Sequence, residues 1–304
     1  MLVIAKVAVL LLALGPVGLE AAQTADKPRD HAISLGLVSE IARQEIEDHF
    51  REFARYVARR LSTASEIEGK VVIAPRALLL AKLLYEKKVD FYMESPYPTY
   101  LINKQGAAVL ILRRWKGGIA EYRSLILAKT DGGISRLEAL RGKMIAFEDP
   151  GSTSGYFLPK VLLLKKGFRL TEKAGLEAKV SPREVGYVFG STARAVVDWV
   201  LAQRVAAGAV SNDDHALLDE KGRAGMVILA ETESFPRHLV SVRRDLPRAL
   251  TTRLKEILLS MDQDPEGRKI LQQIDNTTRF DLLPGGEPVV RRKLMELFRP
   301  RGKQ

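Results

Sequence analysis

Three consecutive hydroxyl side chains follow an Asp-Pro-Gly turn at residues 149–151 and precede an apolar run. They are Ser152, Thr153 and Ser154, and Gly155 comes next. Hydroxyls at the start of a helix lie beside backbone N–H groups that have no partner within the helix, and beside the positive end of the helix dipole. Such a place holds a small oxyanion without a metal or a lysine. One hydroxyl is enough for a helix cap, so we predict that this loop binds an anion.

The same loop departs from two motifs of enzymes and nucleotide-binding proteins. A nucleophile elbow has Ser at the centre of Gly-x-Ser-x-Gly, whereas Thr153 is at the centre of residues 151–155. A phosphate-binding P-loop has Gly-Lys-Ser or Gly-Lys-Thr at its end, and neither follows here. The loop therefore favours binding over catalysis, and we predict no enzymatic activity.

Composition restricts the remaining possibilities. The chain has 304 residues, of which 46% are hydrophobic, so it can form one large domain or two of ordinary size. It has no cysteine, which excludes disulfides and a lipid-anchor cysteine, and its 4 histidines lack metal-ligand spacing. We predict no metal site and no cofactor. The net charge of +11 comes from scattered basic pairs, which indicate a solvated basic surface with, at most, a weak attraction for anions.

Residues 1–22 have the pattern of a secretory signal. Lys6 precedes an apolar core at residues 7–14, Gly-Pro at residues 15–16 ends that core, and Ala21-Ala22 offers a cleavage site. The apolar core is too short to span a bilayer comfortably. We therefore expect export to the periplasm, where nucleic acid is not a partner. A single Lys before the core leaves an uncleaved anchor open as the alternative.

The spacing of apolar residues predicts two β-α-β-α-β units. The first unit has strands at 33–38, 71–74 and 89–93 and helices at 46–61 and 77–85. The second has strands at 144–147, 185–189 and 206–210, a helix from about 156 to 165 and another at 193–202. Further strands are expected at 107–112, 122–128, 226–230 and 238–242, and helices at 134–141, 246–260, 267–275 and 287–297. Such units form parallel sheets flanked by helices, with ligands at the C-terminal ends of the strands.

Two separate units followed by a returning segment predict two lobes. We expect lobe one to comprise residues 31–120 plus 228–304 and lobe two to comprise residues 121–227, with the chain crossing twice between them.

Several segments together resemble the phosphate, phosphite and phosphonate substrate-binding proteins of ABC transporters. They are Gly-Leu-Val-Ser-Glu at 36–40, residues 88–91 leading to 95–97, residues 122–126, residues 137–143, and Asp-Pro-Gly-Ser-Thr-Ser-Gly at 149–155, which is the most specific. The resemblance covers nearly all of the chain after the signal. It implies a type II periplasmic-binding-protein fold, in which two lobes, each a mostly parallel sheet flanked by helices, close on a ligand in the cleft between them. It also implies a monomer that captures a small oxyanion of the phosphate, phosphite or phosphonate type for a membrane ABC permease.

The resemblance assigns roles to individual residues. It implies that Ser152, Thr153, Ser154 and the amide at Gly155 hold the oxyanion and that the aromatic Tyr97 lines the pocket, with Tyr100 as the alternative. The other candidates follow the predicted strands at their C-terminal ends. They are Ser39, Ser191, Thr192, Asn212 and Asp213.

One candidate departs from the family pattern. Family members commonly carry a His after the Gly-Ser pair at the position of Thr192, and a hydroxyl supplies no charge. His238 in the returning segment is a candidate for a compensating contact. Without an imidazole at residue 192, we expect binding to be independent of pH between about 6 and 8, apart from the titration of the ligand itself.

Two other functions are compatible with this fold. One is a ligand-sensing module of a membrane signalling system, which has the same binding site and a different membrane partner. The other is an enzyme on the same fold, which needs a reactive Lys or His in the cleft or a cysteine cluster. The chain has no cysteine, and its main anion loop contains no His.

Overall fold

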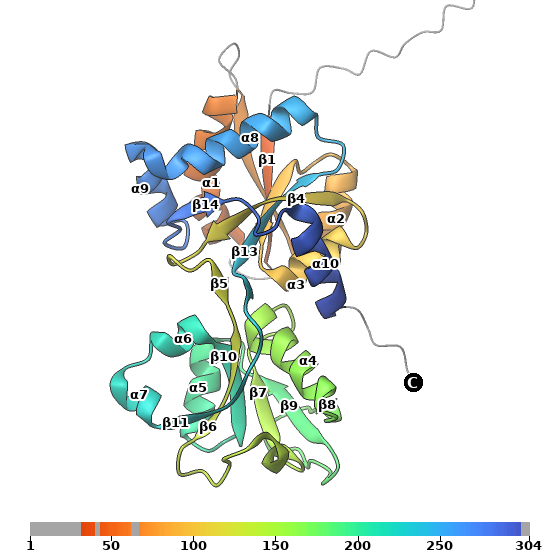
Figure 1. The fold of residues 1–304 in the computed structure, drawn as a ribbon, viewed down its shortest axis with the longest axis vertical. Coiled ribbons are helices and arrows are strands. Elements are labelled where there is room, and N and C mark those ends of the chain that lie inside the picture. Colours follow the sequence, from red (N-terminus) through yellow and green to blue (C-terminus); the bar gives the residue numbers. More distant parts are fainter. Residues whose placement is uncertain (1–31, 40–42, 62–66, 299–304) are drawn as a thin grey trace, which may run out of the picture. The chain divides into compact units, whose positions relative to one another are not determined.

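Two six-stranded sheets organise the part of the chain that the structure describes (Figure 1). The structure, a computed structural model, describes residues 32–39, 43–61 and 67–298. The predicted signal at residues 1–22 lies outside these residues. Within them, no helix has both the length and the hydropathy of a membrane crossing.

The first sheet has the order β14-β4-β13-β3-β1-β2. Its strands are β1 (Ala32–Val38), β2 (Glu68–Ala74), β3 (Phe91–Glu94), β4 (Ala108–Trp115), β13 (His238–Arg243) and β14 (Arg279–Asp281). Its helices are α1 (Arg43–Leu61), α2 (Ala77–Tyr85), α3 (Pro96–Asn103), α8 (Arg248–Ser260), α9 (Pro265–Gln273) and α10 (Glu287–Phe298), and a short 3-10 turn, η3 (Met261–Gln263), lies between α8 and α9.

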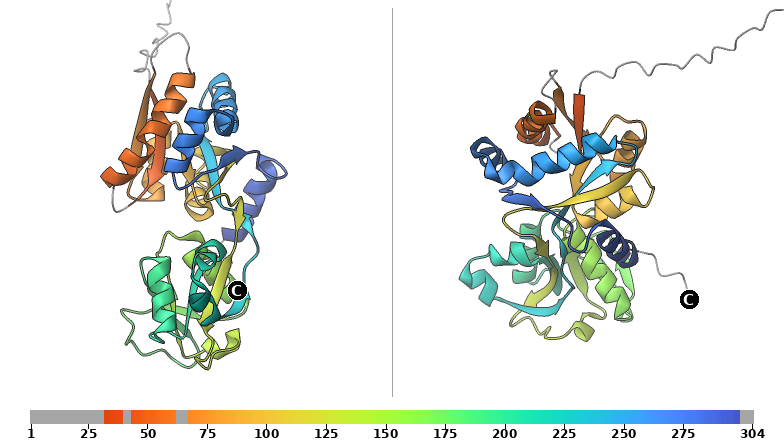
Figure 2. Two further views of the ribbon diagram at one scale, coloured as in Figure 1. Left: turned by 90° about the vertical axis from the view of Figure 1, so that its left-hand side faces the viewer. Right: turned by 45° about the horizontal axis from the view of Figure 1, so that its top comes forward.

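Successive side chains along the central strands point to opposite faces of this sheet, so an apolar core forms on each face. On β3, Phe91 and Met93 pack on one face with residues of α1 and α8, whereas Tyr92 packs on the other face with Leu80 and Leu84 of α2. Figure 2 shows these helices from two further directions. The helices thereby fix the ends of β1 and β3, from which candidate site residues project.

The second sheet has the order β11-β6-β10-β7-β9-β8. Its strands are β6 (Ser124–Lys129), β7 (Met144–Phe147), β8 (Leu170–Glu172), β9 (Val185–Phe189), β10 (Ala207–Ser211) and β11 (Met226–Glu231). Its helices are α4 (Leu158–Lys165), α5 (Ala193–Leu201), α6 (Asn212–Ala216) and α7 (Glu220–Ala224), with the 3-10 turn η1 (Leu137–Leu140) and the π-helical turn η2 (Thr153–Phe157). Leu163 of α4 packs in the core on one face, and Val196 and Val200 of α5 pack in the core on the other.

The chain crosses between the sheets twice, through segments that pair with each other. β5 (Glu121–Tyr122) follows the first sheet, β12 (Phe235–Pro236) follows the second, and the two form an antiparallel ribbon. β11 pairs with β6 as far as Glu231. The lobe boundary predicted between residues 227 and 228 therefore falls inside β11, and the returning crossing lies after this strand.

Both sheets are mixed, with parallel strands at the centre. β1 is parallel to β2 and β3, and β7 is parallel to β9 and β10, as the β-α-β-α-β units predict. β13 and β4 are antiparallel neighbours in the first sheet, and β6 is antiparallel to β10 and β11 in the second. The strands that enter from the other sheet, β13 and β6, run against the parallel set, whereas β4 and β11, which leave for the other sheet, run with it. The α/β class is as predicted.

Candidate ligand-binding site

The hydroxyl loop connects β7 to α4, and its first hydroxyl is a helix cap. Ser152 is the N-cap of η2, and its Oγ accepts a hydrogen bond from the amide of Gly155 at 2.9 Å. The same hydroxyl donates to Oε2 of Glu148 at 2.7 Å. Gly155 is packed so closely that a Cβ atom there would lie 2.4 Å from this Oε2 atom. One of the three hydroxyls therefore organises the loop, and a π-helical turn of this kind is frequent at functional sites.

The second hydroxyl joins the loop to the first sheet. Thr153 is 2% exposed, and its Oγ1 accepts a hydrogen bond from the amide of Tyr97 at 2.9 Å and donates to Oγ of Ser95 at 3.0 Å. Ser95 is the N-cap of α3, which begins at Pro96. The N-termini of α3 and of η2, which continues into α4, therefore meet at Thr153. Two helix N-termini that converge on one point favour negative charge there.

Tyr97 contacts the loop through its backbone, while its ring packs against a neighbour. The ring stacks on Phe157 with 3.9 Å between the centroids. Tyr100, the alternative, is 9% exposed and packs against Phe298 of α10. The structure therefore brings Tyr97 and not Tyr100 to the loop, and lining of the pocket by the Tyr97 ring stays a prediction.

Four other candidates follow strands of the second sheet that lie beside β7. The amide of Ser191, after β9, donates to the carbonyl of Glu148 at 2.7 Å. Thr192 is exposed and caps α5 through a hydrogen bond from the amide of Ala195 at 3.1 Å. Asn212, after β10, accepts from the amide of Arg123 at 2.7 Å.

Asp213, which also follows β10, forms an ion pair with Arg237, with 2.9 Å between Oδ2 of Asp213 and Nε of Arg237. Ser39 follows β1 in the first sheet, and its amide donates to the carbonyl of Ala74 at 2.9 Å. All of these candidates lie at the C-terminal ends of their strands, and their contact with a ligand stays a prediction.

His238 is not suited to replace the charge that Thr192 does not supply. Its Nδ1 lies 3.4 Å from Nη1 of Arg114. Burial first, and then the charges of Arg114, Lys116 and Arg237, hold the pKa of His238 well below its ordinary value. His238 is therefore neutral at physiological pH. The preceding residue, Arg237, is a cation that lies close enough to the loop for its charge to oppose the rise that burial causes in the pKa of Glu148.

Two carboxyl groups beside the loop have raised pKa values. Glu94, at the end of β3, accepts a hydrogen bond from the amide of Val38 at 2.6 Å. Burial raises its pKa to about 7, although that amide and Lys116 oppose the shift. Burial also raises the pKa of Glu148, against the hydrogen bond from Ser152. Carboxylates repel an anionic ligand, so these groups link anion binding to proton uptake.

We expect binding to weaken as pH rises, which revises the expectation that it is independent of pH. A bound anion disfavours the ionised form of Glu94, so affinity is highest below the pKa of about 7 and falls as pH rises through it. At an effective dielectric constant near 20, the expected loss between pH 6 and 8 is roughly tenfold. The measurement is the ratio of wild-type to Glu94→Gln affinity at each pH, because the titration of the ligand cancels in this ratio. A constant ratio would contradict the role of Glu94.

Four neighbours of the loop could not be predicted from the sequence. They are Glu94, Glu148, Tyr122 and Arg237. Glu148 had a local signal, since it lies directly between β7 and the hydroxyls. Tyr122 lies on the outgoing crossing and Arg237 directly follows the returning one. Their proximity to the loop depends on the pairing of β5 with β12. That pairing has no local signature in the sequence.

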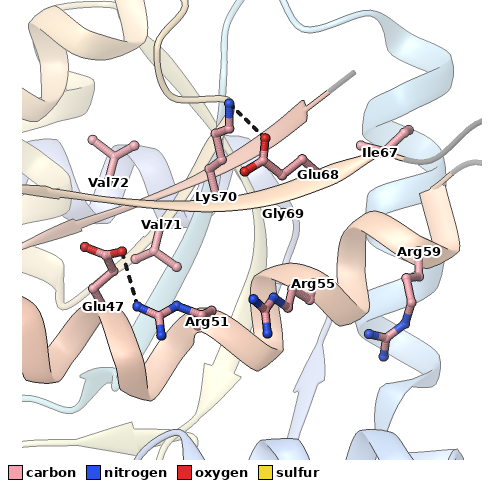
Figure 3. Close-up of a pocket in the computed structure, with 10 residues that line it drawn as sticks. All are labelled: Glu47, Arg51, Arg55, Arg59, Ile67, Glu68, Gly69, Lys70, Val71 and Val72. Carbon is pink, nitrogen blue, oxygen red and sulfur yellow. Dashed lines mark ion pairs between the residues drawn. The ribbon is translucent and has the colours of Figure 1, made fainter. Parts of the chain in front are cut away.

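A separate cavity of about 610 Å³ lies between α1 and β2, and Figure 3 shows its lining. Its four cationic side chains are each paired with a carboxylate. The pairs are Arg51 with Asp48 at 2.5 Å, Arg55 with Glu52 at 2.8 Å, Arg59 with Glu266 at 2.5 Å and Lys70 with Glu68 at 3.0 Å. β2 is an edge strand of its sheet, and charged side chains over an edge ordinarily prevent pairing with other chains. We therefore place the candidate site at the hydroxyl loop.

Across the described ranges, no group of three or more acidic or histidine side chains is arranged to hold a metal ion. The groups gathered at the hydroxyl loop are hydroxyls, amides, one guanidinium and carboxyls of raised pKa. This set suits hydrogen bonding to an oxyanion.

A known protein family matches this chain over most of its length. The family described as "ABC transporter, phosphonate, periplasmic substrate-binding protein" matches residues 35–283. The phosphate-import protein PhnD of Mycolicibacterium smegmatis is 34% identical over 97 residues, which span 31% of this chain and only 29% of that relative.

Solved structures show the same fold. XAC2383 from Xanthomonas citri bound to ATP is 27% identical, with a TM-score of 0.78 over 88% of this chain and 95% of that one. PhnD1 from Prochlorococcus marinus in complex with methylphosphonate is 15% identical, with a TM-score of 0.62 over 88% of this chain and 98% of that one, and it supports the fold alone. The fold is that of the type II periplasmic-binding proteins, as predicted. The chain belongs to the periplasmic substrate-binding proteins of phosphonate ABC transporters.

Proposed function

We propose that this protein captures a small oxyanion of phosphorus, of the phosphate, phosphite or phosphonate type, at residues 152–155 and delivers it to a membrane ABC permease. Each sheet with its helices acts as one lobe, and the ligand is held between the loop and the N-terminus of α3. The protein acts as a monomer and catalyses no reaction.

The observation that carries this proposal is the meeting of two helix N-termini at Thr153. Oγ1 of Thr153 accepts the hydrogen bond of the Tyr97 amide. A ligand oxygen at this position would accept the same bond and would be held by both sheets at once. Ligand that bridges both lobes favours the closed form, which is the form that a permease recognises.

The test is a thermal-shift and calorimetry screen of the purified protein against phosphate, phosphite, methylphosphonate, ATP and sulfate. A ligand at 100 times its dissociation constant stabilises the folded state by about 2.7 kcal/mol. We expect at least one phosphorus oxyanion to give this shift and sulfate to give less. Stabilisation by sulfate alone, or by none of the five, would contradict the proposal.

ATP is in the screen because a specific similarity favours a nucleotide as the second candidate ligand. XAC2383 bound to ATP resembles this chain more closely than the methylphosphonate-bound PhnD1 does. Lys116, on the crossing that leaves β4, lies close enough to Arg237 to feel its charge, and the two are the cations that a longer phosphate chain would need. Tighter binding of ATP than of methylphosphonate in this screen would select this candidate.

A further inference from the structure

Arg237 lies between the returning crossing and β13, and its side chain points back to the outgoing crossing. Its amide donates to the carbonyl of Ala120 at 2.8 Å, which fixes the backbone. Its guanidinium lies over the ring of Tyr122, 4.5 Å from the centroid, and its Nε donates to Oδ2 of Asp213 at 2.9 Å. The side chain is 15% exposed. The arginine is therefore held rigidly by one ring and one carboxylate.

Unused hydrogen-bonding groups surround this guanidinium. Oη of Tyr122 and Oδ1 of Asp213 are buried, and neither has a hydrogen-bond partner among the residues that the structure describes. Within the same residues, the hydrogen bond of Arg237 is made by Nε, which leaves its two Nη groups available as donors. Buried polar groups in native proteins are nearly always paired. Several such groups in one place indicate that a ligand completes their hydrogen bonds.

These groups adjoin the hydroxyl loop. Burial raises the pKa of Tyr122 to about 12, while Arg237 and the neighbouring hydroxyl of Thr153 oppose the rise. Arg237 likewise opposes the rise in the pKa of Glu148, which carries the hydrogen bond from Ser152. Tyr122 and Arg237 therefore face the same small region as the hydroxyls.

We propose that Arg237 and Tyr122 complete the oxyanion site, with the Nη groups and the phenol donating hydrogen bonds to the anion that the hydroxyl loop holds. This inference rests on the proposed function and identifies the residue that supplies the positive charge of the binding site. Thr192 is neutral and exposed and His238 is neutral, so the guanidinium is the cation of the site. Arginine forms charge-assisted, planar hydrogen bonds, which are roughly twice as strong as neutral ones and suit a tetrahedral dianion. The ligand class is therefore a phosphonate or phosphate dianion in preference to a monoanionic sulfonate.

The test is calorimetry of methylphosphonate and methanesulfonate with wild-type protein and four variants. Arg237→Met should weaken methylphosphonate binding by about ten- to a hundredfold and Tyr122→Phe by about tenfold. The preference for methylphosphonate over methanesulfonate should shrink in Arg237→Met. The matched control is Arg123→Met, on the outgoing crossing, because Arg123 also pairs with a carboxylate, Glu231, but is 42% exposed. The control should bind as wild type does.

A double variant separates ligand contact from a structural role. Arg237→Met leaves Asp213 buried without its cation, so that variant can lose affinity through distortion alone. The double variant Arg237→Met/Asp213→Asn leaves neither side chain of this pair charged. Its midpoint temperature of thermal unfolding should therefore be close to that of wild type. We expect its affinity to stay at least tenfold below wild type. Recovery of full affinity in the double variant would overturn the inference, as would unchanged binding in Arg237→Met. A wild-type protein that binds no phosphorus oxyanion would overturn the proposed function as well.

Discussion

A variant in which Ser152, Thr153 and Ser154 are all alanine should bind its phosphorus oxyanion at least about a thousandfold more weakly than wild type. Alanine at residues 153 and 154 removes one hydrogen bond each to a charged ligand, and each such bond contributes about 1.5–3 kcal/mol. Alanine at residue 152 also releases the loop that the Ser152 hydroxyl holds through Glu148 and Gly155. The Thr153 change should be the largest single loss, because Thr153 also joins the loop to Ser95 and to the amide of Tyr97. Calorimetry of the three single variants and the triple variant measures these losses.

The fold should survive these changes, because the loss of the Ser152 cap costs about 1 kcal/mol. Asp219→Ala is the matched control. Asp219 caps α7 in the same way, with Oδ1 accepting from the amide of Gly222 at 2.7 Å. This control should lose similar stability and no affinity. A triple variant that is folded and retains wild-type affinity would show that the anion binds elsewhere.

Replacing Arg114 by Met should lower the free energy of unfolding by about 3–5 kcal/mol, the range for breaking a buried ion pair. Arg114 is 1% exposed. Its guanidinium donates at 2.8 Å to each of three acceptors, Oγ1 of Thr277, the carbonyl of Ile274 and Oδ2 of Asp275. Methionine leaves all three acceptors without this donor, and Lys116 at 3.4 Å compensates Asp275 only in part.

Urea denaturation followed by circular dichroism measures the effect of Arg114→Met. Arg194→Met is the control, because the Arg194 side chain is 78% exposed and pairs with Asp198 one helical turn away. Exposed pairs of this kind contribute about 0.3–0.5 kcal/mol. A loss for Arg114→Met as small as that of the control would mean that the buried network does not stabilise the first sheet.

The elements that could be predicted from the sequence are those in which local pattern and tertiary burial agree. β9 and α2 begin and end at the predicted residues, because both are short apolar runs bounded by polar or turn residues. α3 was missed because Pro96 and Pro98 indicate a loop, although Pro is compatible with the first turn of a helix. The sequence predicts that β4 ends at Leu112, because the charged residues Arg113 and Arg114 usually mark the end of a strand. In the structure β4 continues through Trp115. Their partners, Asp281 and Asp275, are distant in the sequence and allow the strand to continue.

For the candidate site as well, residues with a local sequence signal could be predicted, and contacts between distant segments could not. The hydroxyl loop and the residues after β9 and β10 could be chosen as candidates from the sequence because each lies next to its own strand, and their contact with a ligand stays a prediction. The contacts of the loop with Ser95 and Tyr97 join residues more than fifty positions apart. The Arg237 ion pair depends on where the returning crossing lies beside β10. His238 was chosen because histidine titrates near neutral pH, and burial together with the surrounding cations lowers its pKa well below that range.

The most direct measurement is a crystal structure of the protein with the phosphorus oxyanion that binds most tightly in the screen. We predict ligand oxygens within hydrogen-bond distance, about 2.7–3.2 Å, of Oγ1 of Thr153, the amide of Tyr97 and the guanidinium of Arg237. The hydrogen bond that now joins Thr153 to Tyr97 should be replaced by a bond to the ligand. An oxyanion bound in the cavity between α1 and β2, or anywhere out of reach of residues 152–155, would contradict this account.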